Sequence, residues 1–111
     1  MRCRLCREPA GWFRRLCAVC ERLGGIVARH RGVGFSQILD LLLATGASRA
    51  HVEAFLAADP DGRGSARDQI VADMTNELMG ALGQAGPQSA ADVKRVRERG
   101  QWTGYDQPPR T

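Results

Sequence analysis

Apolar residues recur at helical spacing through residues 36–100, and this pattern predicts a mainly α-helical domain. The densest apolar run lies between Ile38 and Leu43, where five of six residues are apolar. Because apolar side chains then surround the segment on almost every side, we expect a buried central helix over about residues 37–45, capped by Ser36.

Serine caps mark the starts of three further helices. Ser48 precedes the first of them, over about residues 49–58. The other two open with a serine followed three residues later by an aspartate, the pattern of a capping box, and extend over about 66–82 and 90–99. The apolar stripe expected to face the core from the 66–82 helix consists of Ile70, Val71, Met74, Leu78 and Leu82.

The first 20 residues follow a different pattern, in which two Cys-x-x-Cys motifs flank a short polar and aromatic segment. The turn signal at 9–11 and the β-capable residues 12–16 predict a β-hairpin between the motifs. The fold we expect is therefore mainly α, with an N-terminal β-hairpin zinc finger followed by a small bundle of four or five short helices. Its expected divisions are a zinc finger (1–31), a linker (32–35), a helical domain (36–100) and a flexible tail (101–111).

The two motifs together have the spacing C-x2-C-x10-C-x2-C and use every cysteine of the chain, Cys3, Cys6, Cys17 and Cys20. Each motif can aim two thiolates at one point, and two motifs complete a tetrahedral shell around one structural zinc ion. Iron in a rubredoxin-like site is an alternative with similar ligands. A four-thiolate shell leaves no open position for a substrate, so we expect no catalysis at this site.

The sequence around these motifs resembles the four-cysteine treble-clef and zinc-ribbon-like fingers. The resemblance covers residues 3–31, from Cys3-x-x-Cys6-Arg-Glu-Pro-Ala to Leu16-Cys17-x-x-Cys20-Glu-Arg-Leu. It implies a first motif held in a hairpin and a second motif that opens a helix. Arg7 stands where glycine is commonest in such fingers. The resemblance implies a metal and a fold but no particular activity.

A second, weaker resemblance covers residues 38–56, which are similar to the helix-turn-helix of bacterial regulators. Gly46 would lie in the turn, and Arg49 and His51 would face DNA from the second helix. Two core helices joined by a glycine turn are the favoured alternative, because that arrangement is common in helical proteins. The segment is also net acidic, which does not favour phosphate contact.

Charge is distributed unevenly along the chain, whose net charge is +4. Residues 1–35 carry eight arginines against two glutamates, and residues 93–111 are also basic, whereas residues 36–92 are acidic. Arginines that alternate with Trp12 and Phe13 can grip a single-stranded nucleic acid, although we favour a small core beside the metal for these two aromatic residues. The candidate nucleic-acid contacts are Arg2, Arg4, Arg14, Arg15, Arg49, His51, Lys94 and Arg95.

Two aromatic residues in the tail, Trp102 and Tyr105, are candidate anchors for a partner. We expect a cytoplasmic, non-enzymatic zinc-binding adaptor or regulatory protein that docks a macromolecular partner, with a protein preferred. The alternative is a small DNA- or RNA-binding transcriptional regulator. Neither a secretory signal nor an apolar run long enough to cross a membrane is apparent, so we expect no membrane partner.

Overall fold

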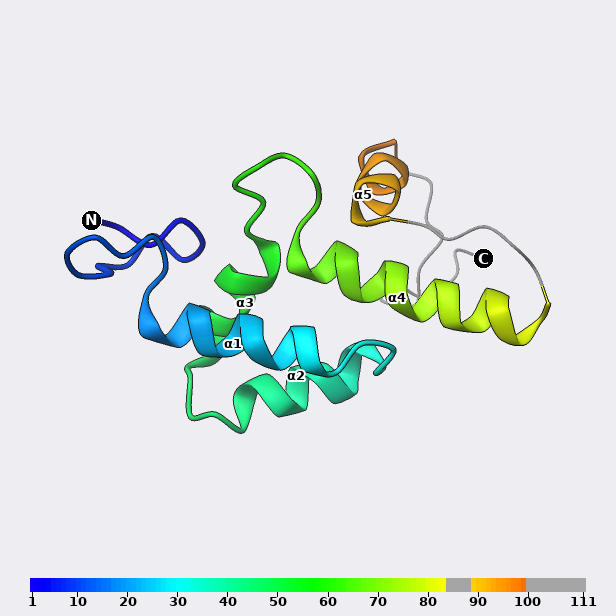
Figure 1. Ribbon diagram of the computed structural model, residues 1–111, viewed down its shortest axis with the longest axis horizontal. Coiled ribbons are helices and arrows are strands. Elements are labelled where there is room, and N and C mark those ends of the chain that lie inside the picture. Colours follow the sequence, from blue (N-terminus) through cyan, green and yellow to red (C-terminus); the bar gives the residue numbers. More distant parts are fainter. Residues whose placement is uncertain (84–88, 100–111) are drawn as a thin grey trace.

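A computed structural model describes residues 1–83 and 89–99. These residues form five helices, which lie in the order α1 (Ala18–Arg29), α2 (Phe35–Leu43), α3 (Arg49–Ala57), α4 (Ala66–Ala81) and α5 (Ala90–Glu98) (Figure 1). The predicted mainly helical fold is therefore confirmed. The bounds of α2 to α5 agree with the predicted ranges to within about two residues, and Ser48, Ser65 and Ser89 each cap the helix that follows them. The prediction that Ser36 caps α2 is wrong, because the helix begins at Phe35 with Gly34 as its N-cap.

The predicted β-hairpin is absent from the described residues. They contain no strand, and a single antiparallel bridge joins Arg2 to Pro9. The segment expected to be β bends instead, because Gly11 has a φ of 82° and Phe13 a φ of 60°, left-handed values that a strand cannot adopt. Isolated backbone bonds, such as Arg4 N–H to Arg15 O at 2.9 Å, hold the loops together in place of a ladder.

Helices α1, α2 and α3 pack around one core (Figure 1). Its centre is formed by Leu23, Ile38, Leu42 and Val52, whose side chains are at most 1% exposed. Ile70 from the start of α4 joins this core. Cysteines of both motifs belong to the same buried cluster, so the two Cys-x-x-Cys motifs and the helices bury their apolar surface together.

Helix α4 extends beyond this core, and its apolar stripe does not stay buried. Ile70 and Val71 are buried as predicted, but Leu78 is 45% exposed and Leu82 is 61% exposed. The prediction that these two leucines face the core is therefore wrong. The helices of the core contact only the first part of α4, and periodicity alone does not reveal where such a contact ends.

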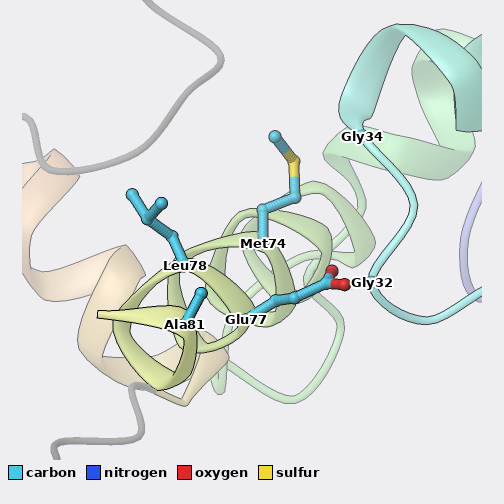
Figure 2. A pocket seen from close by; sticks show the side chains of 6 residues that line it. All are labelled: Gly32, Gly34, Met74, Glu77, Leu78 and Ala81. Carbon is cyan, nitrogen blue, oxygen red and sulfur yellow. The ribbon is translucent and has the colours of Figure 1, made fainter. Parts of the chain in front are cut away.

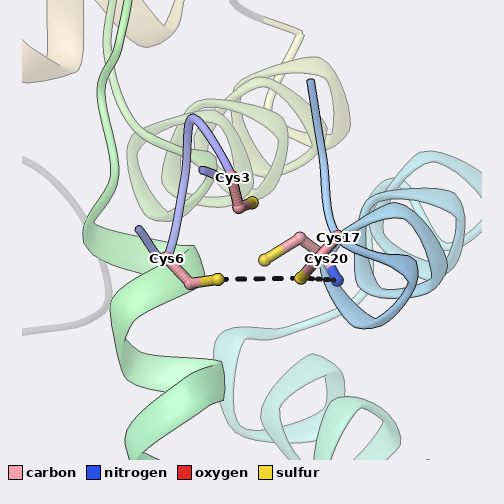
Figure 3. Close-up of side chains that lie close together, drawn as sticks. All are labelled: Cys3, Cys6, Cys17 and Cys20. Atoms are coloured by element: carbon pink, nitrogen blue, oxygen red, sulfur yellow. Dashed lines mark hydrogen bonds between the residues drawn. The ribbon is translucent and has the colours of Figure 1, made fainter. Parts of the chain in front are cut away.

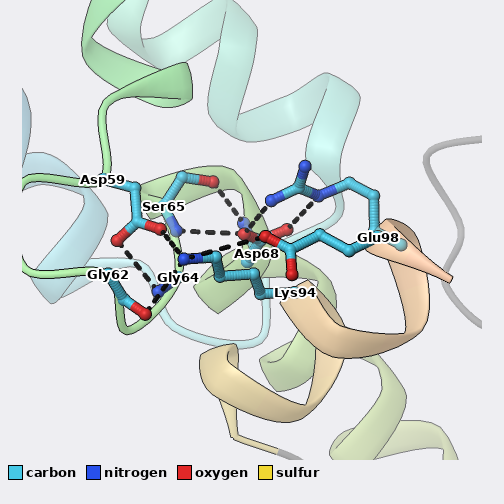
Figure 4. Close-up of polar contacts among 8 residues, drawn as sticks. Asp59, Gly62, Gly64, Ser65, Asp68, Lys94 and Glu98 are labelled. Carbon is cyan, nitrogen blue, oxygen red and sulfur yellow. Dashed lines mark hydrogen bonds and ion pairs between the residues drawn. The ribbon is translucent and has the colours of Figure 1, made fainter.

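Helix α5 packs on the first half of α4 through a small apolar cluster, Val71, Ala72 and Val93. Polar contacts also join α5 to α4 and to the loop before α4 (Figure 4). Arg97 donates two hydrogen bonds to the buried carboxylate of Asp68, at 2.8 and 3.0 Å, and Lys94 pairs with Asp59 at 2.7 Å. These contacts fix α5 against α4 and against the loop between α3 and α4.

Candidate metal centre

Four cysteine side chains converge at the start of α1 (Figure 3). Their sulfur atoms all lie within 4.8 Å of one another, and none of the four forms a disulfide. Zn–S bonds of about 2.3 Å in a tetrahedron would separate the sulfurs by about 3.8 Å. The separation of Cys6 Sγ and Cys17 Sγ, 3.6 Å, agrees with that spacing. The set, called here the cysteine cluster, is Cys3, Cys6, Cys17 and Cys20, and it could hold one metal ion.

Local backbone structure places each cysteine pair. Cys17 is the N-cap of α1, and its sulfur accepts a hydrogen bond from Cys20 N–H at 3.4 Å, so the first helical turn brings both sulfurs to one side. In the first motif, Arg7 N–H donates to Cys3 O at 3.1 Å, and Arg7 adopts a left-handed φ of 68°. That conformation explains why glycine is common at this position in similar motifs.

Burial and hydrogen bonds together shift the pKa values of Cys3, Cys6 and Cys20. Cys3 and Cys20 are at most 1% exposed. Burial raises the pKa of Cys20, and its hydrogen bonds to neighbouring thiols and the charge of Cys3 raise that pKa further. Burial also raises the pKa of Cys6. Burial opposes ionisation of Cys3 as well, but backbone hydrogen bonds outweigh it and lower the pKa of Cys3 to about 6. A bound divalent cation would offset the like charges, so the donor set fits a thiol-seeking metal ion.

His51 reaches the cysteine cluster from α3. Its Nε2 lies 3.3 Å from Cys20 Sγ and 3.6 Å from Cys17 Sγ. The sequence predicted a nucleic-acid contact for His51, but its ring lies against these sulfurs, half-buried. Sequence reasoning missed this contact because more than 30 residues separate His51 from the cysteines, and no spacing motif connects them.

Trp12 and Phe13 are the most exposed large apolar side chains of the described residues, at 87% and 89%. The prediction that they form a core beside the metal is therefore wrong. Their rings contact each other edge to face, with centroids 6.1 Å apart. The left-handed backbone at Phe13 belongs to a loop, residues 11–15, in which every residue is exposed. This segment is called here the aromatic loop.

The predicted nucleic-acid contacts have varied surroundings. Arg14 and Arg15 are exposed on the aromatic loop, where Arg14 lies 4.0 Å from Glu21. Arg4 is nearby in the first motif and pairs with Asp61 at 2.6 Å. The remaining four have partners in the chain: Arg2 donates to Arg7 O, Arg49 pairs with Glu53, Lys94 with Asp59, and Arg95 with Asp92.

An open apolar groove of about 370 Å³ lies where α4 passes the glycine-containing loop before α2 (Figure 2). Met74, Leu78 and Ala81 line it from α4, and Gly32 and Gly34 line it from the loop. Among the described residues that line it, Glu77 is the single ionisable one, and no histidine, cysteine or lysine accompanies it. These mostly apolar lining residues have the character of a binding surface. The predicted anchors Trp102 and Tyr105 lie outside the described residues.

Comparison of the chain with known protein families, with curated proteins and with solved structures finds no match. Within residues 1–83 and 89–99, no helix has both the length and the apolar character needed to cross a membrane. The assignment of a metal site therefore depends on the geometry of the cysteine cluster.

Proposed function

We propose that the cysteine cluster binds one structural zinc ion and that the protein is a non-enzymatic regulator that binds single-stranded nucleic acid through the aromatic loop. Zinc is proposed because four thiolates in a tetrahedral arrangement are its usual structural shell, with iron as the competing metal. The observation that carries the proposed binding function is the exposure of Trp12 and Phe13 beside Arg14 and Arg15.

Aromatic side chains do not remain almost fully exposed on a well-anchored loop without a cost, since each leaves a large apolar surface in water. Here Cys17 anchors the loop on one side, and Ala10 N–H bonds to Met1 O on the other. A loop held in this way presents its rings to a partner without a large loss of conformational entropy on binding. Bases stack on such rings regardless of sequence.

The positive charge of residues 1–35 also favours a nucleic-acid partner. Residues 1–35 have a formal charge of +6, from eight arginines and two glutamates. Four thiolates and one zinc ion lower that value by two and leave the segment basic. Exposed arginines next to stacking rings neutralise phosphates while bases occupy the rings.

The test is a titration of the zinc-loaded protein with a fluorescent oligothymidylate and with an RNA of mixed sequence, at low and at higher salt. Trp12→Ala with Phe13→Ala should weaken binding roughly 30-fold or more, since stacking contributes about 1–3 kcal/mol per base. Leu82→Ala, an exposed apolar side chain at the far end of α4, is the matched control and should bind as the wild type does.

Arg14→Ala with Arg15→Ala should weaken binding of both oligonucleotides equally and reduce the salt slope by about 1.4, the value for two phosphate contacts on a single strand. Arg31→Ala with Arg63→Ala removes the same charge from other exposed positions and serves as the control. If the wild-type protein does not bind either oligonucleotide at low salt, the proposed binding of single-stranded nucleic acid is refuted.

A protein-docking adaptor is the second candidate, and the apolar groove favours it. Met74 and Leu78 offer an apolar surface that is partly open to solvent, which is typical of a site for an apolar side chain of another protein. The same oligonucleotide titration separates the candidates. An adaptor that binds another protein through this groove should not bind the oligonucleotides, whether or not Trp12 and Phe13 are present.

A further inference from the structure

The ring of His51 connects α3 to two members of the cysteine cluster. Its Nε2 lies within hydrogen-bonding distance of Cys20 Sγ and Cys17 Sγ, at 3.3 and 3.6 Å. Ser48, the N-cap of α3, accepts a hydrogen bond from His51 N–H at 3.1 Å, so the first turn of the helix fixes the position of the residue. The sulfur of Cys17 also accepts from Cys20 N–H.

We propose that His51 is a positioning residue of the metal centre, whose Nε2–H donates to the sulfurs of Cys20 and Cys17 and thereby retains the metal ion. The inference rests on the metal-site part of the proposed function and is independent of nucleic-acid binding. Four thiolates around a divalent cation leave a net charge of −2 in a buried site. A directed N–H donor spreads part of that charge away from the sulfurs.

Of the four cysteines, Cys20 is the most buried, so a hydrogen bond from the protein matters most for its thiolate. It is 0% exposed, so bulk water does not solvate its thiolate. Groups that donate to metal ligands from outside the shell hold the ligands in position and raise metal affinity, and their loss typically costs 10–100-fold in that affinity. His51 has the geometry of such a group, and it belongs to a different helix from the ligands that it contacts.

The contact has a consequence for the fold. Cys17 and Cys20 lie at the start of α1, and His51 lies in the first turn of α3. A metal ion held by the cysteines and supported by His51 therefore joins two helices of the core. Loss of the ion should loosen the start of α3 as well as the N-terminal loops, which lack any regular secondary structure of their own.

The test compares zinc retention in three variants, measured by competition with a chromogenic chelator. His51→Phe removes the donor and keeps a ring of similar size, and we expect its zinc affinity to fall 10–100-fold. His51→Gln keeps an N–H at a similar distance from the backbone and should restore affinity to within a few-fold of wild type. His30→Phe is the control at the other histidine, whose Nδ1 lies 2.9 Å from Ile26 O rather than beside a sulfur.

A spectroscopic readout separates donation to the sulfurs from a merely structural role. In cobalt-loaded protein, loss of the donor raises the energy of the sulfur lone pairs, so the sulfur-to-cobalt charge-transfer band of His51→Phe should move to longer wavelength. The bands of His51→Gln and His30→Phe should stay near that of the wild type. An unshifted band together with wild-type zinc affinity in His51→Phe would overturn the inference.

A measurement on the wild-type protein covers the case in which His51→Phe does not fold. Nitrogen NMR of the metal-loaded protein should show a proton on His51 Nε2 that exchanges slowly with water, with coupling across the hydrogen bond to cadmium in the cadmium-loaded form. A deprotonated Nε2, or a proton without that coupling, contradicts the inference. Failure of the wild-type protein to bind metal at all would instead refute the proposed zinc site, so the two failures are distinguishable.

Discussion

Removal of Arg97 is the most informative single perturbation of the helical part. The carboxylate of Asp68 is 3% exposed and accepts two hydrogen bonds from Arg97 and one from Ser65 N–H at 3.0 Å. Arg97→Ala leaves this buried carboxylate with the backbone donor and with no cationic partner. Breaking a fully buried pair costs about 3–5 kcal/mol. Because the side chain of Arg97 is 45% exposed, water screens the pair, and we expect a loss of about 2–3 kcal/mol.

Such a loss is large for a chain of this size, whose free energy of unfolding is roughly 5–15 kcal/mol. It corresponds to a fall in Tm of roughly 10–20 °C. The assay is urea unfolding of the zinc-loaded protein followed by circular dichroism. Arg95→Ala is the matched control, because Arg95 is on the same helix, is 63% exposed and pairs with Asp92 at the surface. Its cost should stay within about 0.5 kcal/mol.

The loss of unfolding free energy in Arg97→Ala should depend on pH through the carboxylate of Asp68. Burial alone would raise the pKa of Asp68, but the hydrogen bonds from Arg97 and Ser65 outweigh burial and lower that pKa below its ordinary value of 3.8. The stabilisation is therefore fully present above about pH 4 and is lost as the pH falls through the folded-state pKa. Equal stabilities of Arg97→Ala and Arg95→Ala at neutral pH would refute the reasoning.

Three further substitutions test the packing and the backbone by the same unfolding assay. Leu23→Ala, at a side chain that is 0% exposed, should cost about 2–5 kcal/mol, and a loss below 1 kcal/mol would mean that α1 is not part of the core. Gly64→Ala should cost at least about 1 kcal/mol, because its φ is 114° and its new Cβ would lie 2.7 Å from Ala90 O; an unchanged midpoint would contradict the close packing of α5. Arg7→Gly should be tolerated, with stability unchanged or raised by up to about 1 kcal/mol, since it relieves a left-handed φ of 68°. A clear destabilisation by Arg7→Gly would show that the arginine side chain has a structural role.

Local signals in the sequence predicted the helices well. Ser48, Ser65 and Ser89 each lie one residue before a helix, whereas Ser36, also predicted as a cap, lies inside α2. The two capping boxes, at Ser65 with Asp68 and at Ser89 with Asp92, form both of their reciprocal hydrogen bonds. These signals succeed because the interactions span only three residues, so no distant part of the chain decides them. Each cysteine pair was predictable for a similar reason, since its two members are three residues apart in the sequence.

Features that depend on distant contacts were not predictable. The exposure of Trp12 and Phe13 follows from left-handed backbone in the aromatic loop, which β-propensity does not reveal. The exposure of Leu78 follows from where the neighbouring helices end. The contact of His51 with the cysteine cluster requires the packing of α3 on α1, so no short motif encodes it. The divisions expected at 31 and 36 and the tail beyond residue 100 stay predictions.

X-ray absorption at the zinc edge, on protein purified without added metal, tests the zinc site most directly. The account predicts one zinc ion per chain with four sulfur neighbours at about 2.3 Å, and with the nitrogen of His51 outside the first shell. Protein without metal, protein that contains iron instead, or a zinc shell with a nitrogen or oxygen ligand would contradict it.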